Sequence, residues 1–259
     1  MSQPRLKNLL QNNPQALVIP QFPQFSDTTT SCCTDQILSV YPNYIKENKI
    51  DVIRSFHKLK GFIDLSVLQI KNHLEKYPVD ELVISFHGIP VRYVTQKNDP
   101  YYLHCCETYT LIKEQINNTP SLKHLNISMS FQSRLGSEKW LGPYTDEFIT
   151  EKVRNTPGLR VGVYCPSFVA DCLETTDEIG RELLHDVEEE GGELVFVPCL
   201  NNELNWVKAQ GAMIKSYLKD PRAVKENSEY SELFYHPTEE KVKANMPELK
   251  DEVTPMTPE

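Results

Sequence analysis

The segment Ser85-Phe86-His87-Gly88-Ile89-Pro90 follows directly on the apolar run Glu81-Leu82-Val83-Ile84. A short run rich in Leu, Val and Ile that ends at Gly and Pro predicts a buried strand of a parallel sheet, after which the chain turns. His87 therefore lies at the carboxyl end of a strand, the edge at which α/β proteins bind their ligands. A neutral imidazole there can bind a divalent metal or accept a proton, although a hydrogen-bonded structural histidine is the commoner case.

Short apolar runs alternate with amphipathic segments along the chain, which indicates repeated β-α units and a mostly parallel sheet. The predicted strands are 16–19, 50–56, 81–86, 125–129, 159–164 and 193–197. The predicted helices are 31–40, 62–75, 101–116, 145–154, 175–190 and 201–219. In the last helix, the apolar residues that recur at helical spacing are expected to face the sheet. They are Leu204, Val207, Met213 and Ile214.

Two groups of strands, before and after residue 80, predict two lobes. We expect residues 1–80 to be the remnant of an N-terminal lobe, 81–219 to form the lobe with the metal site, and 220–259 to be a polar, flexible tail. Only two predicted strands precede the Ser85 motif, which is few for a parallel sheet, so the first lobe is expected to be incomplete. The predicted fold class is α/β, with two Rossmann-like lobes whose parallel sheets are flanked by helices.

The composition is that of an ordinary globular protein, with 39% hydrophobic and 24% charged residues among 259. The net charge of -9, from 36 acidic and 27 basic residues, argues against nucleic acid as a partner. No apolar stretch approaches the ~20 residues that span a bilayer, and the N-terminus lacks a secretory signal. We therefore expect a cytoplasmic protein, or a matrix protein in a mitochondrion, that could touch a membrane only peripherally. The seven cysteines have no CxxC spacing and are expected to be reduced thiols.

Strand 159–164 leads into the predicted helix 175–190, and Glu174, just before this helix, is followed by Glu178 and Glu182 at intervals of four residues. This spacing lines carboxylates along one helix face, where each raises the proton affinity of the next. A solvated acidic face is the alternative for Glu178 and Glu182, because acids are favoured near a helix start. Glu174 lies at the strand-to-helix turn and could point into a cleft. Since parallel strands end at one edge of a sheet, Glu174 and His87 could form a metal-binding or proton-transfer pair.

Several ordered segments together resemble the ferrochelatase family. They are Pro20–Ser26 with Thr28 and Thr29, Ser85–Tyr93 with Asn98–Tyr101, Phe131–Gly136 with Trp140–Glu147, Cys165–Glu174 and Pro198–Asn202. The resemblance extends over residues 16–218. It implies two Rossmann-like lobes that bind no nucleotide. It also implies a lyase that inserts ferrous iron into protoporphyrin IX to form protohaem, the terminal step of haem synthesis, although the chain alone leaves coproporphyrin open as the substrate.

The resemblance also implies roles for individual acidic and basic residues. His87 matches the family's histidine, which is thought to bind metal or accept a pyrrole proton, and Glu174 matches its acidic partner across the cleft. These two are the expected catalytic and metal-binding residues. Glu178 and Glu182 fall on the acidic helix line that is thought to carry metal or protons.

The expected porphyrin-binding residues are Phe168 and Trp140, which match aromatic positions of the family's pocket, and Ile89, which adds apolar wall together with Leu135. Trp140 could instead be a core anchor. Arg92 or Arg134 could meet an acidic substituent of the macrocycle, although surface ion pairs are the usual state of such arginines.

The chain departs from the family pattern in two places. It has no counterpart to the family's opening strand and loop, so one wall of the porphyrin pocket would be missing and a partner could supply that part. Some family members hold an iron-sulfur cluster, but here Asp27 occupies one ligand position and no cysteine follows Cys199. We therefore expect no cluster and no permanent cofactor, with ferrous iron only as substrate. The alternatives are a catalytically impaired porphyrin- or metal-binding protein and a cobalt or nickel tetrapyrrole chelatase.

Overall fold

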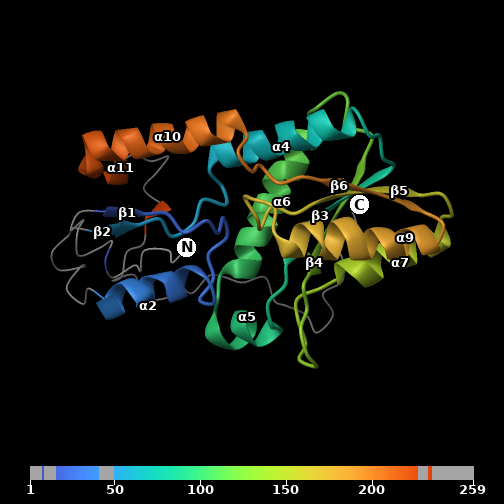
Figure 1. The fold of residues 1–259 in the computed structure, drawn as a ribbon, viewed down its shortest axis with the longest axis horizontal. Coiled ribbons are helices and arrows are strands. Elements are labelled where there is room, and N and C mark those ends of the chain that lie inside the picture. The colour runs from blue at the N-terminus through green and yellow to red at the C-terminus, as the bar shows by residue number, and fades with distance from the viewer. Residues whose placement is uncertain (1–7, 9–15, 41–49, 227–232, 235–259) are drawn as a thin grey trace.

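The computed structural model describes residues 8, 16–40, 50–226 and 233–234. They form an α/β fold with two parallel sheets (Figure 1). The first part contains β1 (Ala16–Val18), α2 (Thr30–Val40), β2 (Ile50–Val52) and α4 (Lys60–Leu74). The second contains β3 (Glu81–His87), α5 (Val91–Lys97), α6 (Tyr101–Asn117), β4 (Asn126–Gln132), α7 (Thr145–Asn155), β5 (Arg160–Tyr164), α8 (Leu173–Thr176), the π-helix η1 (Glu178–Leu183), α9 (Leu184–Glu189), β6 (Glu193–Val197), α10 (Leu204–Lys219) and α11 (Pro221–Glu226).

The larger sheet has the strand order β4-β3-β5-β6, and every neighbouring pair is parallel. Successive residues of β3 point to opposite faces, as in any strand. Leu82, Ile84 and Phe86 join the core with α4 and α6, whereas Val83 joins the core with α7 and α9. Figure 1 shows the resulting layers, with α4 above this sheet and α7 and α9 below it. The predicted α/β architecture, with six strands alternating with helices, is confirmed over the described residues.

The smaller sheet pairs β1 with β2 in parallel. Its buried residues Ile50 and Val52 form a separate small core with Ile37 of α2, whereas Leu17 packs against the larger core. Ile53 and Phe56, which follow β2, are buried in the same cluster as Trp206 and Met213 of α10. In Figure 1, α10 and α4 run end to end along the top of the molecule, and α6 crosses between the two sheets. The two sheets are therefore joined by continuous apolar packing. The predicted boundary at residue 80 stays a prediction.

The predicted orientation of α10 is wrong at two of its four residues. Leu204 and Val207 are 60% and 51% exposed, whereas Met213 is buried and Ile214 is half-buried. The buried face is formed by Trp206, Met213 and Tyr217, which recur at seven and four residues and so lie above one another on the helix. Two large aromatic rings on that face bury more apolar surface than Leu204 and Val207 would, and they decide the orientation.

The predicted helix 175–190 is not one continuous α-helix. The segment consists of α8, the π-helix η1 and α9, because the backbone N–H of Glu182 bonds to the carbonyl of Asp177 at 2.8 Å, five residues back. Such π turns are rare and are commonly found at functional sites.

The flexible tail stays a prediction, and its first residues have regular structure where they are described. Residues 221–226 form α11, Val224 is buried, and the buried Phe234 forms a β-bridge with Ile53. The remaining residues of the predicted tail, 227–232 and 235–259, lie outside the described part of the chain. Among the described residues, no helix is both long and apolar enough to cross a membrane.

Two glycines provide a matched test of the packing. A Cβ on Gly192 would lie 2.6 Å from Cγ1 of Val153 and 3.0 Å from the carbonyl oxygen of Leu159, whereas one on Gly211 would meet nothing within 4 Å. We expect Gly192→Ala to lower the free energy of unfolding by about 2 kcal/mol through overpacking. Gly211→Ala should raise it by about 0.5–1 kcal/mol, because alanine is the better helix former. Urea denaturation of both variants measures this, and equal effects would contradict the packing between α7 and the start of β6.

Candidate functional site

His87 is the last residue of β3, and its surroundings fix the orientation of its ring. Its Nδ1 lies 2.6 Å from the carbonyl oxygen of Gly88, which can only accept, so Nδ1 carries the proton and donates. Its backbone is held by Tyr101, whose hydroxyl donates to the His87 carbonyl at 2.7 Å, and by Ser167, whose Oγ accepts from the His87 N–H at 3.1 Å. With the proton on Nδ1, the lone pair of Nε2 is the one that can bind a metal or a proton.

Glu174 lies in the first turn of α8 and is half-buried. Its own backbone N–H, the thiol of Cys172 and, more weakly, His87 lower the pKa of its carboxyl, while partial burial opposes them. The carboxylate is therefore charged at neutral pH.

Two cavities meet at His87 and Glu174, and both residues line both of them. One cavity, of about 480 Å³, has a mainly apolar and aromatic wall. That wall includes Phe22, Ile89, Pro90, Tyr93, Tyr101, Trp140 and Phe168. The other, of about 770 Å³, is lined by a row of carboxylates, which we call the acidic groove. They belong to Asp146, Glu174, Asp177, Glu178, Glu182 and Asp186.

The three residues expected to bind porphyrin all lie in the wall of the apolar cavity, namely Ile89, Trp140 and Phe168. The Phe168 ring is 6.0 Å from the His87 ring, edge to face. The Trp140 ring packs closely on Gly88, because a Cβ added to Gly88 would lie 3.2 Å from a carbon of the ring. The Nε1 of Trp140 is buried and has no hydrogen-bond partner within the described structure.

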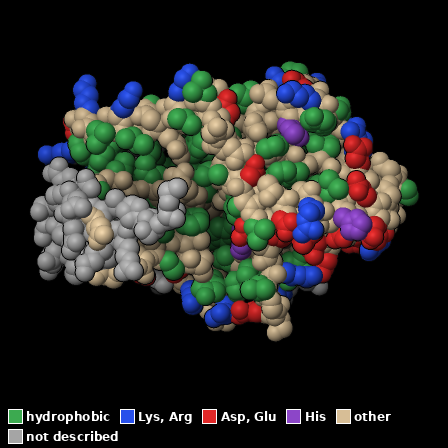
Figure 2. Space-filling model, viewed as in Figure 1, with side chains coloured by type: hydrophobic (Ala, Val, Ile, Leu, Met, Phe, Trp, Pro, Cys, Tyr) green, Lys and Arg blue, Asp and Glu red, His purple; other side chains and the backbone are tan. Residues whose placement is uncertain are grey.

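Glu178 and Glu182 line the acidic groove, but they differ in their contacts. Glu178 accepts hydrogen bonds from both the backbone N–H and the Oγ of Ser133, each at 2.6 Å. This pairing supports the left-handed backbone of Ser133, whose φ is 63°. The Glu182 carboxylate is 60% exposed and contacts Arg181. Figure 2 shows acidic side chains gathered over the α8–α9 segment in the right half of the molecule.

The other residues considered for the pocket wall have different surroundings. Leu135 is 79% exposed and lines the acidic groove instead of the apolar cavity. Arg92 pairs with Glu138, and Arg134 pairs with Glu147 at 2.7 Å. Both arginines therefore form surface ion pairs, while Arg92 also lines the aromatic cavity and Arg134 the acidic groove.

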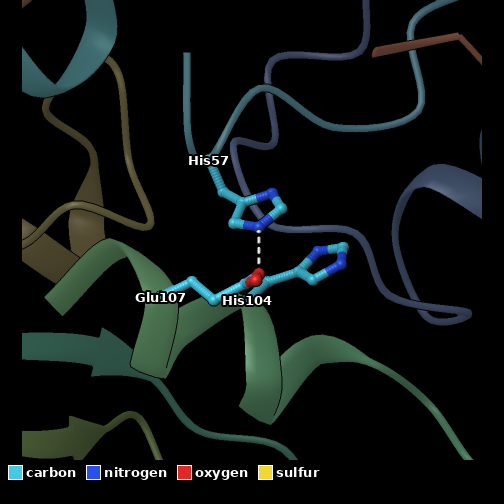
Figure 3. A group of neighbouring side chains, drawn as sticks. All are labelled: His57, His104 and Glu107. Atoms are coloured by element: carbon cyan, nitrogen blue, oxygen red, sulfur yellow. Dashed lines mark hydrogen bonds and ion pairs between the residues drawn. The ribbon is translucent and has the colours of Figure 1, made fainter. Parts of the chain in front are cut away.

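A second group of metal-ligating side chains lies at the junction of the two sheets, where α6 meets the segment after β2 (Figure 3). His57 Nε2 and Glu107 Oε2 are 2.7 Å apart, and the His57 ring stacks on His104 with centroids 3.8 Å apart and planes at 8°. His104 Nδ1 accepts from the backbone N–H of Phe25 at 3.1 Å. Burial, helped by His57 and nearby cations, lowers the pKa of His104 to about 2, so this ring is neutral.

The geometry of this group favours a structural contact over a metal centre. Nitrogen lone pairs lie in the ring plane, and the planes of His57 and His104 are nearly parallel, so their lone pairs do not converge on one point. Since the neutral His104 carries its proton on Nε2, neither of its nitrogens offers a free lone pair. The group instead ties the segment around His57 and the turn at Phe25 to α6.

The architecture defines a class of protein, a two-lobed chelatase-type α/β fold. The structure titled SirB from Bacillus subtilis with Fe3+ superposes with a TM-score of 0.56 over 86% of this chain and 81% of that one, at 9% sequence identity. At this identity the likeness concerns the fold alone.

The sequence comparisons identify the family. The family model Ferrochelatase matches residues 2–218, and the chain belongs to the ferrochelatase family. It is 35% identical to the ferrochelatase of Azoarcus sp. strain BH72 over 202 residues, which are 77% of this chain and 54% of that protein. It is 36% identical to the ferrochelatase of Nitrosomonas europaea, over 78% of this chain and 54% of the relative. The chain thus spans about half the length of these relatives.

The contact between His57 and Glu107 predicts a pH-dependent stability. The hydrogen bond from His57 lowers the pKa of the Glu107 carboxyl below its ordinary 4.5. A depressed folded-state pKa stabilises the protein above the ordinary value, and this stabilisation is lost as the pH falls through the folded-state pKa. We expect Glu107→Gln to cost about 1 kcal/mol at pH 6, allowing for solvent screening, and nothing once the carboxyl is protonated.

Urea midpoints of wild type and variant, measured from pH 6 down to pH 3, check this expectation. Glu114→Gln is the matched control, because Glu114 is an exposed carboxylate of the same helix. The same pH dependence in both variants would contradict a specific contact at Glu107.

Proposed function

We propose that this chain is a ferrochelatase, a lyase that inserts ferrous iron into protoporphyrin IX to form protohaem. The observation that carries the proposal is the meeting of an aromatic cavity and an acidic groove at His87 and Glu174. One space suits a flat apolar macrocycle and the other a hydrated divalent cation. Membership of the ferrochelatase family supports the same reaction.

The reaction exchanges one Fe2+ for two pyrrole protons, with no change in oxidation state. In the proposed mechanism, the macrocycle lies against Phe168, Trp140 and Ile89. His87 Nε2 accepts one pyrrole proton, and the other passes to water in the open cleft. This role agrees with the Nδ1–H of His87 donating to Gly88, which leaves Nε2 as the basic nitrogen. A ring fixed at the end of a strand needs little reorganisation when the proton moves.

Glu174 is proposed to hold the incoming ferrous ion opposite His87. A carboxylate with a lowered pKa stays ionised, and a ligand set of few hard oxygens binds Fe2+ weakly enough to release it to four pyrrole nitrogens. Glu178 and Glu182 would lead the ion along the acidic groove. In this scheme Glu178 keeps its two hydrogen bonds from Ser133 and therefore binds an ion only loosely.

We propose that iron is substrate only and that the chain holds no iron-sulfur cluster. Among the described residues, the side chains grouped closely enough to hold a metal ion are His57, His104 and Glu107, and this group contains no cysteine. The proposal also keeps a cytoplasmic location, with at most peripheral membrane contact and no nucleic acid as partner. A partner that supplies further pocket wall stays a prediction.

Replacement of the paired residues tests the function. We expect His87→Ala and Glu174→Gln each to lower the rate of haem formation from Fe2+ and protoporphyrin IX by roughly 100-fold or more, because each removes a proton acceptor or metal ligand. The rate is followed by the loss of free-base porphyrin fluorescence under anaerobic conditions. His124→Ala and Glu114→Gln change the same residue types at exposed positions and should leave the rate unchanged.

Three outcomes would contradict the proposal. Normal turnover in His87→Ala or Glu174→Gln removes that residue from the mechanism. Wild-type protein that binds porphyrin but never forms haem is a binding protein. A strong preference for Co2+ or Ni2+ with another tetrapyrrole assigns it to a different chelatase.

A further inference from the structure

Gln132 is a buried polar residue that touches both sides of the metal cleft. It is the last residue of β4 and is 3% exposed. In the parallel ladder it pairs with His87, and its carbonyl oxygen accepts from the N–H of Gly88 at 2.8 Å. The backbone of Gln132 is therefore fixed to the turn that carries the imidazole.

The side chain of Gln132 reaches Glu174. Its Nε2 donates to the backbone carbonyl oxygen of Glu174 at 2.6 Å. Its Oε1 accepts from the Oγ of Ser85 at 2.9 Å and from the Sγ of Cys165 at 3.2 Å. Two donors on the oxygen fix which way the amide faces, so the NH2 group must point at Glu174.

A chain of hydroxyls supports this arrangement. The Oγ of Ser85 also contacts the Oγ1 of Thr145 at 2.7 Å, which in turn contacts the Oγ of Ser130 at 2.8 Å. Ser85, Ser130 and Thr145 are buried, and hydrogen bonds in such a chain strengthen one another. The amide of Gln132 thus ends a polar network inside the sheet that faces the cleft.

The segment that carries Glu174 depends on polar contacts because it has little apolar packing. α8 is one turn long, and its first residue, Leu173, is 70% exposed. Glu174 is the second residue of this short helix, so a shift of its backbone also moves its carboxylate. The hydrogen bond from Gln132 acts on that same residue.

We propose that Gln132 is a positioning residue that sets the distance between the His87 imidazole and the Glu174 carboxylate. The inference rests on the proposed chelatase function for its catalytic meaning. The hydrogen bond from the Gln132 amide to the Glu174 carbonyl, which we call the clamp, can be measured without that activity. A buried planar group that donates on one side and accepts on the other is needed at this position, and at neutral pH glutamine provides both.

In Gln132→Glu, an ionisable carboxyl group replaces the amide that forms the clamp. The introduced carboxyl can still accept from Ser85, but it can donate to the Glu174 carbonyl only while protonated. We expect the ratio of the chelation rate of Gln132→Glu to that of wild type to be highest near pH 5.5. It should fall about tenfold per pH unit above the pKa of that carboxyl, which burial raises. Gln132→Leu should be slow at every pH.

The matched control is Gln69→Glu. The Nε2 of Gln69 donates to the carbonyl oxygen of Pro198 at 3.1 Å, so this variant also sets a carboxyl against a backbone carbonyl, but at a part-buried position on α4. Its rate ratio should not vary with pH. A loss of stability alone would affect both variants alike, whereas the clamp predicts pH dependence only at Gln132.

Hydrogen exchange provides the measurement that needs no chelation. We expect the amides of residues 173–178 to exchange about tenfold faster in Gln132→Leu, and in Gln132→Glu at pH 8, than in wild type. The amides of β5 should be unchanged. Wild type that forms no haem would refute the proposed function, and exchange would then decide this inference by itself. A pH-independent rate ratio in an active enzyme, or unchanged exchange at 173–178, overturns the role of Gln132.

Discussion

The parallel pairing of β3 with β4 on one side and β5 on the other is the constraint on which the site depends. Pairing of His87 with Gln132 and of Ile84 with Tyr164 brings the ends of three strands to one edge. A slip of one residue would turn every side chain of β3 to the opposite face, so burial on both faces strongly specifies this register. The cleft is therefore an outcome of core packing, and its chemistry is carried by the residues at and just beyond the carboxyl end of each strand.

The junction between the two sheets uses buried polar contacts in place of further apolar surface. Asp99 is 1% exposed and accepts from the hydroxyl of Ser26 and the backbone N–H groups of Asp27 and Tyr101, at 2.8, 2.8 and 3.0 Å. Burial raises the pKa of this carboxyl even though the three hydrogen bonds oppose the shift. Such a group specifies one geometry, because any other arrangement leaves a buried acid without its donors. With the contact of Phe25 to His104, it fixes the turn at 20–26, which borders the aromatic cavity.

The sequence predicted those features that depend on local pattern. The apolar run before His87 and the Gly and Pro after it were sufficient to predict a strand that ends at the cleft. The role of Gln132 could not be predicted, because its sequence neighbours, Phe131 and Ser133, do not reveal which carbonyl lies within 2.6 Å of its amide. The π turn could not be predicted either. The backbone N–H of Glu182 bonds to the carbonyl oxygen five residues back, at Asp177, and the sequence does not distinguish this bond from an α-helical one to the residue four back. Apolar spacing alone gave the wrong face of α10, because Trp206 and Tyr217 compete with Leu204 and Val207 for the core.

The acidic groove is costly to the fold. Carboxylates of Glu174, Glu178 and Glu182 share one groove in a protein whose net charge is already -9, and like charges at such spacing are destabilising. Compensation is partial, since Arg181 contacts Asp177 and Glu182 on the exposed side. Core packing does not require these acids, because the buried residues of η1 are Ile179 and Leu183. The core needs none of these acids, and the row that they form ends beside His87, which supports the proposed passage of a cation along the groove to the neighbouring cavity.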